Sequence, residues 1–292
     1  MSEVAPGLIT VFGGTGFIGS QVVQALARRG WRIRIACRRP DRAWKLQTAG
    51  TVGQIQAMRC DAADPAQAAE AVHGADAVIN LIGILYETPG RKFEALHVGV
   101  SRTIAEACAV AGARLVQMSA LGANPESDST YSRTKAAAEM AVREVKPDAI
   151  IVRPSVVFGP GDDFLNTFAK MAQTAPVLPL IGGGQTKFQP VYVGDVAAAI
   201  ATAIGDTASD GQTYELGGPA VMTFEDILKL VARETYREPG FAPLPFPVAK
   251  AIGALAQITA VVGIKPVLTE DQVVLLRSEE HTSELQSRAY IV

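Results

Sequence analysis

The chain has 292 residues, of which 48% are apolar and 19% charged, and its formal net charge is −2. These values predict a globular protein with a sizeable buried core and give no electrostatic support to a nucleic-acid-binding function. The three cysteines, Cys37, Cys60 and Cys108, lack a CxxC spacing and histidines are scarce, so neither a disulfide framework nor a metal site is expected.

Apolar runs that predict β-strands alternate with helical patterns through the first half of the chain. The expected strands are Leu8–Phe12, Arg32–Cys37, Ile55–Cys60, Ala77–Gly83, Arg114–Ala120 and Ala149–Pro154. The expected helices between them are Ser20–Gly30, Pro65–Gly74, Val98–Gly112 and Tyr131–Val145. This alternation predicts an α/β fold, a Rossmann-like doubly wound parallel sheet with helices on both faces.

The second half is less regular and richer in proline and glycine. We expect Gln189–Gly205 to form a strand and then a helix that is capped near Asp195. We assign residues 1–155 and 186–217 to one Rossmann-like domain, and residues 156–185 and 218–276 to a smaller C-terminal lobe.

Val248–Ile264 is the most apolar stretch of the chain, but it includes Lys250 and Gln257 and is short for a membrane span. Its composition favours a helix that packs on its own domain. The alternative is a helix that lies against a membrane or a membrane-bound partner.

The two ends of the sequence carry separate expectations. The first strand is expected to begin near Leu8, so we expect no signal peptide or transit sequence and a cytoplasmic protein. The stretch RSEEHTSELQS, Arg277–Ser287, resembles the in-frame translation of a sequencing adapter. We therefore expect the natural chain to run only to about Leu276, and we leave residues 277–292 out of the fold prediction.

The segment GGTGFIG, which connects the first strand to the first helix, predicts a phosphate-binding loop. Gly13 would let the chain turn, Gly16 would leave space for a pyrophosphate, and Gly19 would let the helix pack close to the sheet. The helix N-terminus would offer free N–H groups and a positive dipole end to the phosphates. The predicted cofactor-binding residues in this loop are Gly13, Thr15, Gly16, Phe17, Ile18 and Gly19.

The end of the second strand indicates which dinucleotide would bind. An NAD site usually has an acidic residue there, whereas this chain has Arg38 and Arg39, which could pair with the 2′-phosphate of NADP(H). We therefore predict NADP(H) in preference to NAD(H). Asp61 and Ala62, after the third strand, are candidates for the adenine edge, and the competing role of Asp61 is a turn or a helix cap.

These residues resemble the short-chain dehydrogenase/reductase superfamily, in its extended and atypical branches. The glycine loop, NLIG (Asn80–Gly83), Tyr131-x-x-x-Lys135, RPSVVFGPGD and VYVGDVAAAI occur in that family's order and cover nearly the whole chain. Within the superfamily, INLIGILYET, QMSALGAN, YSRTKAAAE, GDDFLNTFAKM and LTEDQVVLL resemble the NADPH-binding accessory subunits of respiratory complex I and their bacterial relatives.

The resemblance implies a catalytic triad in active members. A tyrosine is the acid–base, a lysine lowers the tyrosine pKa and binds the nicotinamide ribose, and a hydroxyl after the fifth strand binds the substrate. Tyr131 and Lys135 share one face of a helix. Ser119 is the only hydroxyl in MSALGAN, and the usual catalytic position falls on Ala120 or Leu121. The constellation is incomplete, so we favour cofactor binding without turnover.

The resemblance also implies further cofactor contacts. Leu81 and Gly83 would run along the adenosine–ribose side of the cofactor. Pro154 and Ser155 would lie near the nicotinamide amide. The alternative for Leu81 and Pro154 is sheet packing and the end of a strand.

Three functions follow as hypotheses from the resemblance. The first is an NADP(H)-binding structural or assembly subunit of respiratory complex I, in contact with subunits near the membrane arm or quinone site and peripheral on the inner face of the membrane. The second is an NADP(H)-dependent reductase, epimerase or dehydratase that acts on a small carbonyl or sugar-nucleotide substrate. The third is a sensor of the NADPH/NADP ratio that acts through a protein partner.

Overall fold

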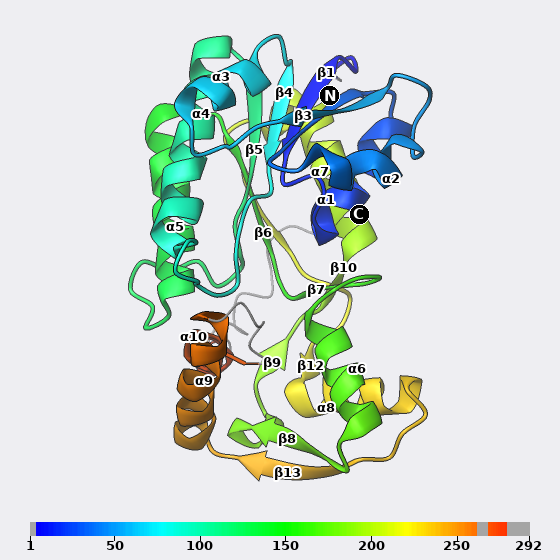
Figure 1. Cartoon of the computed structure of the whole chain (residues 1–292), viewed down its shortest axis with the longest axis vertical. Coiled ribbons are helices and arrows are strands. Elements are labelled where there is room, and N and C mark those ends of the chain that lie inside the picture. Colours follow the sequence, from blue (N-terminus) through cyan, green and yellow to red (C-terminus); the bar gives the residue numbers. More distant parts are fainter. Residues whose placement is uncertain (1–3, 262–267, 279–292) are drawn as a thin grey trace.

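Seven parallel strands form the main sheet of the computed structural model, which describes residues 4–261 and 268–278 (Figure 1). The strands pair in the order β11-β6-β5-β4-β1-β2-β3, and every neighbouring pair is parallel. Their bounds are β1 Leu8–Phe12, β2 Arg32–Cys37, β3 Ile55–Arg59, β4 Ala77–Asn80, β5 Arg114–Met118, β6 Ile150–Pro154 and β11 Thr213–Leu216. The predicted Rossmann-like fold class is confirmed.

Helices cover both faces of this sheet (Figure 1). One face carries α1 Phe17–Arg28, α2 Trp44–Gln47 and α7 Val193–Gly205, and the other carries α3 Pro65–Val72, α4 Val100–Ala111 and α5 Thr130–Val145. Each set of helices buries a separate apolar core against the sheet, because the strands are apolar on both sides. The strand order reverses between β1 and β4, which is where this type of sheet leaves a crevice beyond the carboxyl ends of its strands.

Several observed boundaries differ from the predicted ones, and most of these differences are of one to three residues. The fourth strand ends at Asn80, and a π-helical turn at Glu94–Gly99 precedes α4. Helix α7 begins at Val193 with Tyr192 as its N-cap, so the expected cap near Asp195 is wrong. Asp195 lies within the first turn instead, where a carboxylate still faces the positive end of the helix dipole. Short 3₁₀ turns lie at Pro40–Ala43, Gly182–Gly184 and Thr207–Ser209.

The smaller lobe has an aromatic core of its own. Phe164, Phe168, Phe188 and Phe224 pack with ring centroids 5.3 to 6.3 Å apart. The lobe's elements are β8 Val177–Ile181, β9 Lys187–Phe188, β12 Met222–Thr223, β13 Gly240–Leu244, α6 Phe164–Thr174, α8 Phe224–Glu234, α9 Phe246–Val261 and α10 Glu270–Ser278. The pair β7 Val157–Phe158 and β10 Val191–Tyr192 lies between the lobe and the sheet (Figure 1). The residue boundaries of the two domains remain a prediction.

Helix α9 contains most of the apolar stretch Val248–Ile264, of which residues 262–264 lie outside the described ranges. Ala249 is fully buried, and a Cβ at Gly253 would lie 2.8 Å from the backbone nitrogen of Glu270. One face of α9 therefore packs on α10, as expected for a helix of this lobe. Within residues 4–261 and 268–278, no helix is both long and apolar enough to cross a membrane. The predicted adapter-derived tail lies outside the described residues apart from its first two.

One carboxylate of α10 connects the smaller lobe to the start of α5. Asp271 accepts hydrogen bonds from the Ser129 hydroxyl at 2.8 Å, the Thr130 N–H at 2.6 Å and the Tyr131 N–H at 3.1 Å. Ser129 is the N-cap of α5 and accepts a further bond from the Ser132 N–H at 3.2 Å. Helix-terminal N–H groups lack partners within the helix, so these bonds hold α5 and α10 together.

Replacing Asp271 by alanine should lower the free energy of unfolding by about 1–2 kcal/mol, because three donors at the start of α5 lose their acceptor. Urea denaturation measures this change. Glu270→Ala is the matched control, since its 3.3 Å ion pair with Lys250 is on the surface and should contribute less than about 1 kcal/mol. Equal losses in the two variants would contradict the capping role of Asp271.

Candidate nucleotide-binding site

The glycine loop has the close packing that the sequence predicts. Gly13 has a φ of +77°, and a Cβ there would lie 3.1 Å from the carbonyl carbon of Leu81. A Cβ at Gly19 would overlap the carbonyl oxygen of Gly13 and lie 2.7 Å from Gly14 Cα. Both positions therefore require glycine, because neither the backbone conformation at Gly13 nor the space at Gly19 accepts a side chain.

Helix α1 begins directly at this loop. Gly16 is its N-cap and makes no side-chain capping bond, while the Gly16 N–H donates to the Gly13 carbonyl at 3.0 Å. Phe17 and Ile18 follow as the first helical residues, and Thr15 precedes them in the loop. The first N–H groups of a 12-residue helix thus face the crevice, and this arrangement fits a pyrophosphate group.

The carboxyl end of β4 lies beside the loop. The Leu81 N–H donates to the Phe12 carbonyl at 3.0 Å, which continues the pairing of β1 and β4 by one residue. Gly83 is exposed, and a Cβ there would lie 3.8 Å from His97 Nε2. The structure therefore places Leu81 next to Gly13, and Gly83 next to the π-helical turn.

Ser119 and the Lys135 ammonium both lie at the carboxyl end of β5. The Lys135 ammonium, which is buried, donates to the Met118 carbonyl at 2.7 Å. Burial lowers the pKa of Lys135 to about 8, and the Glu139 carboxylate opposes part of this shift. Ser119 is 4% exposed, and its hydroxyl has no hydrogen-bond partner among the described residues. A buried hydroxyl without a partner fits a site that a polar ligand would complete.

Pro154 and Ser155 lie on the neighbouring strand end. The Ser119 N–H donates to the Val152 carbonyl at 2.7 Å, and the Leu121 N–H donates to the Pro154 carbonyl at 3.0 Å. The residues that follow β5 therefore continue to pair with β6. Pro154 and Ser155, which are predicted to lie near the nicotinamide, are thus at the same end of the sheet as Ser119.

A buried histidine holds the helix turn that carries Tyr131. The Ile84 N–H donates to His97 Nε2 at 3.2 Å, which leaves Nδ1 as the protonated nitrogen, 3.0 Å from the Thr134 hydroxyl oxygen. That hydroxyl donates to the Tyr131 carbonyl at 3.0 Å. The His97 and Tyr131 rings also meet edge to face, with centroids 5.4 Å apart. Through these contacts His97 fixes where the Tyr131 ring lies.

His97 stays neutral in the folded protein. Burial lowers its pKa to about 3, and the nearby charge of Lys135 acts in the same direction. The scarcity of histidines argues against a metal site, and no sequence motif predicts a role for His97. Its position in the π-helical turn Glu94–Gly99 is a feature that often marks functional sites, but residue periodicity does not reveal such a turn.

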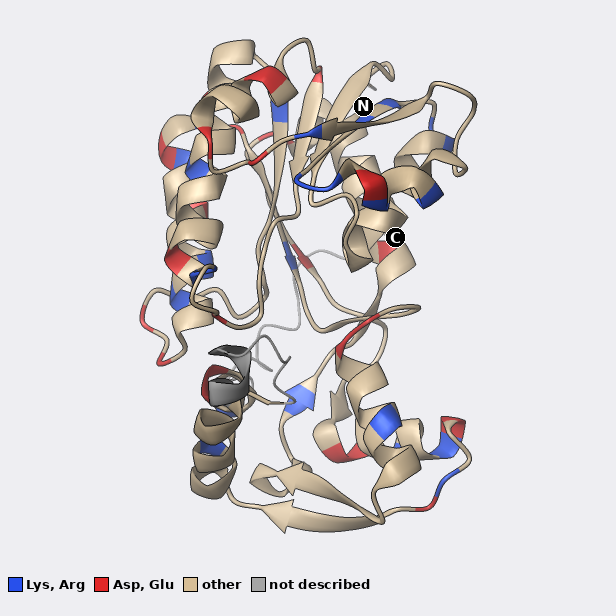
Figure 2. Ribbon diagram, viewed as in Figure 1, with Lys and Arg blue, Asp and Glu red and all other residues tan. Residues whose placement is uncertain are grey.

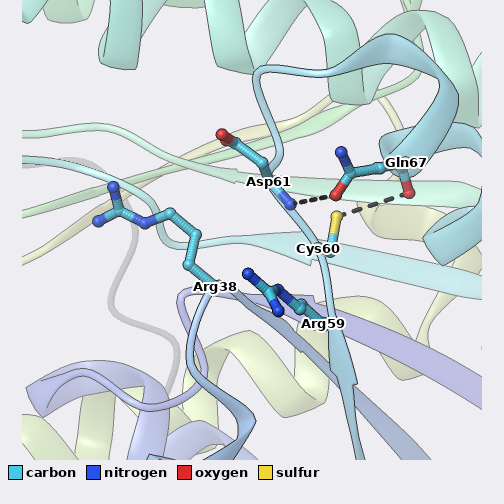
Figure 3. A pocket seen from close by; sticks show the side chains of 5 residues that line it. All are labelled: Arg38, Arg59, Cys60, Asp61 and Gln67. Atoms are coloured by element: carbon cyan, nitrogen blue, oxygen red, sulfur yellow. Dashed lines mark hydrogen bonds between the residues drawn. The ribbon is translucent and has the colours of Figure 1, made fainter.

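A pocket of about 340 Å³ lies at the ends of β2 and β3 (Figure 3). It is lined by Arg38, Arg59, Cys60, Asp61 and Gln67. The Asp61 N–H donates to Gln67 Oε1 at 3.0 Å, and Asp61 Oδ1 accepts from the Ala63 N–H at 3.2 Å. Asp64, and not Asp61, is the N-cap of α3. Asp61 instead accepts a hydrogen bond within a turn and also lines the pocket. Arg59 was not predicted, because its position near a strand end is typical of many solvated arginines.

Arg39 lies apart from this pocket. Its guanidinium pairs with the Asp41 carboxylate at 2.9 Å, and both side chains are 62% exposed. The hydrogen bond between them raises the pKa of Arg39 and lowers that of Asp41. Of the two adjacent arginines, the structure brings only Arg38 to the pocket. Ala62 is buried and is not among the residues that line the pocket.

Comparison with known sequences identifies the family. Residues 9–217 match the NAD dependent epimerase/dehydratase family. The chain belongs to this family. It is 41% identical over 257 residues to "NADH dehydrogenase [ubiquinone] 1 alpha subcomplex subunit 9, mitochondrial" of Arabidopsis thaliana, covering 87% of this chain and 64% of that protein. The Mus musculus protein of the same name is 38% identical over 278 residues, covering 93% and 72%. The predicted resemblance is confirmed.

Another relative has an enzymatic name. The chain is 29% identical over 267 residues to the "Ceramide reductase" of Caulobacter vibrioides, covering 87% of this chain and 79% of that protein. Proteins similar to this chain therefore include both complex I subunits and a protein named as a reductase.

Solved structures of low identity share the fold. A Citrobacter sp. triphenylmethane reductase complexed with NADP(H) superposes with a TM-score of 0.73 at 18% identity, covering 96% and 92% of the two chains. The dTDP-glucose 4,6-dehydratase DesIV of Streptomyces venezuelae gives a TM-score of 0.71 at 19% identity, covering 82% and 84%. These two matches support the architecture alone.

Gly19→Ala should displace the glycine loop, because the new Cβ would overlap the Gly13 carbonyl, which is backbone and cannot move alone. We expect a loss of about 1–3 kcal/mol in the free energy of unfolding and at least tenfold weaker dinucleotide binding. Denaturant unfolding and cofactor fluorescence titration measure the two effects. Gly90→Ala is the control, since a Cβ there meets nothing within 4 Å. A tightly binding, stable Gly19→Ala variant would disprove the close-packing argument.

The buried neutral His97 predicts an acid-sensitive stability. Its pKa rises from about 3 to about 6.5 on unfolding, so the unfolded state binds the extra proton below pH 6.5. Stability should fall as pH drops from 6.5 toward 3, by up to about 1.4 kcal/mol per pH unit from this group. Lys135 adds no slope there, because a pKa of about 8 keeps it charged in both states.

Urea denaturation at pH 7 and pH 5 tests this expectation. His97→Gln should show a smaller loss between the two pH values than the unchanged protein, whatever its stability at pH 7. His73→Gln is the control for the removal of an imidazole, because His73 is exposed. An identical pH dependence in His97→Gln would rule out the role of the buried ring.

Proposed function

We propose that this chain is an accessory subunit of a complex I-type assembly that holds a nicotinamide dinucleotide, NADP(H) in preference to NAD(H), without turning it over. The similarity to the alpha subcomplex subunit 9 proteins, over about nine tenths of the chain, carries the proposal. The glycine loop, the uncapped start of α1 and the buried Lys135 support cofactor holding.

The preference for NADP(H) is supported by the charges near β2. The chain has no acidic residue at the end of β2, where an NAD site would bind the ribose 2′-hydroxyl. Arg38 follows this strand and lines the pocket, so its cation could bind a 2′-phosphate there.

The absence of turnover is supported by the residues after β5. Ser119 is the only hydroxyl in its immediate sequence, and Ala120 and Leu121 stand where a catalytic hydroxyl would be expected. Lys135 already donates to the Met118 carbonyl and, with a pKa of about 8, stays charged at neutral pH. A charged amine in this place can hold a ribose without any proton transfer.

The smaller lobe supplies a surface for partners. Val248, Ile252 and Leu255 are 47%, 48% and 68% exposed and follow a helical spacing along α9. Figure 2 shows few charged residues on this helix. We propose that this stripe contacts a complex I subunit near the membrane arm or quinone site, with the protein peripheral on the inner face of the respiratory membrane.

Purification from native membranes tests the proposal. The protein should co-migrate with complex I and carry NADPH, and added NADPH at about 100 times its Kd should stabilise the isolated chain by about 2.7 kcal/mol. Native electrophoresis, cofactor extraction and thermal denaturation measure these outcomes. Equal partner affinity with NADPH and NADP⁺ is expected for a scaffold, whereas a difference would support the sensor hypothesis. The proposal would be refuted if the protein did not co-migrate with complex I and NADPH did not stabilise it.

A reductase is the second candidate function, favoured by the similarity to the Caulobacter ceramide reductase and by the ordered contact of His97 with Tyr131. In that case Tyr131 would protonate a carbonyl oxygen as the cofactor delivers a hydride. Consumption of NADPH with a panel of carbonyl compounds, including long-chain ones, would support it. That activity should disappear in Tyr131→Phe while cofactor binding persists, and unchanged turnover in this variant would remove Tyr131 from the chemistry.

A further inference from the structure

Two guanidinium groups from neighbouring strands line the same pocket. Strands β2 and β3 pair in parallel with Cys37 opposite Arg59, so Arg38 leaves β2 where Arg59 ends β3. Both side chains are exposed and line the pocket, and Figure 3 shows them extending from two neighbouring segments of the chain. The sequence places these arginines 21 positions apart, and only the register of the two strands brings them together.

Neither arginine has an anionic partner within the described residues. The ion pairs nearest in sequence use other groups, such as Arg39 with Asp41 at 2.9 Å. Asp61, the one acid that lines the pocket, accepts the Ala63 N–H at 3.2 Å and is not within ion-pair distance of either guanidinium. Two unpaired cations that share a pocket repel each other, and an anion with two negative charges would relieve this repulsion.

The chemistry of the pocket selects a phosphate monoester. At neutral pH a phosphate monoester carries close to two negative charges and has three acceptor oxygens, which match two forked guanidinium groups. The volume of about 340 Å³ is at the low end of ligand pockets and suits part of a nucleotide rather than a whole dinucleotide. The Gln67 side chain, which also lines the pocket, is held in place by hydrogen bonds with the Asp61 N–H and the Asp64 carboxylate.

We propose that Arg38 and Arg59 together bind the 2′-phosphate of NADP(H), and that Arg39 does not. This inference rests on the proposed NADP(H) function and assigns its specificity to Arg59, a residue of β3. Arg39 is excluded because its guanidinium is paired with Asp41 and lies outside the residues that line the pocket. Because the two arginines would share one phosphate, the effects of removing them should not add.

Titration of the full chain with NADPH and NADH, by cofactor fluorescence and calorimetry, tests the assignment. Arg59→Gln should weaken NADPH binding about 10- to 100-fold and leave NADH binding within about threefold. Arg38→Gln should behave in the same way, and the double variant should lose less than the product of the two single effects. Arg39→Gln is the matched control and should stay within about threefold for both nucleotides. Arg59→Lys should restore part of the NADPH affinity.

Two smaller ligands, 2′,5′-ADP and 5′-ADP, test the contribution of the 2′-phosphate separately. The chain should bind 2′,5′-ADP more tightly than 5′-ADP, and this difference should shrink in Arg59→Gln and at high salt. Arg59→Gln binding NADPH as tightly as the unchanged protein, or losing NADPH and NADH equally, would overturn the assignment. Failure of the unchanged protein to bind NADPH at all would instead refute the proposed function, so the two failures are distinguishable.

Discussion

The structure depends on the close packing of the first turn of α1 against the glycine loop that follows β1. The Gly16 N–H reaches back to the Gly13 carbonyl at 3.0 Å, and Gly19 packs against the same turn with no space for a side chain. This contact places the helix N-terminus over the crevice between β1 and β4, where the strand order reverses. The positive end of the helix dipole therefore lies at the carboxyl end of the sheet. Leu81 follows β4, Ser119 follows β5 and Pro154 ends β6 at the same end of the sheet.

Two buried polar residues, Lys135 and His97, organise the region around α5. Lys135 is charged and donates to a strand carbonyl, whereas His97 is neutral and links the backbone of Ile84 to the turn that carries Tyr131. The positive charge of Lys135 adds to the effect of burial in lowering the pKa of His97, and so helps to keep His97 neutral. Such a network fixes positions strongly, which suits a bound cofactor whether or not a reaction follows.

The smaller lobe contributes directly to this arrangement. Asp271 accepts three hydrogen bonds at the first turn of α5, the helix that carries Tyr131 and Lys135. The same α10 packs against α9, whose other face exposes Val248, Ile252 and Leu255. A partner that binds α9 would thus be separated from α5 only by α10. The lobe is therefore in indirect contact with the helix that carries Tyr131 and Lys135.

The sequence by itself determined the alternating strands and helices, the glycine loop and the shared face of Tyr131 and Lys135, because residue periodicity and glycine spacing are local properties of the chain. The tertiary structure decided which distant groups meet. It paired Arg39 with Asp41, brought Arg59 to Arg38 through the β2–β3 register, and placed His97 and Asp271 against α5. Contacts of this kind depend on strand register and on the packing of separate elements, and a local pattern in the sequence does not encode them.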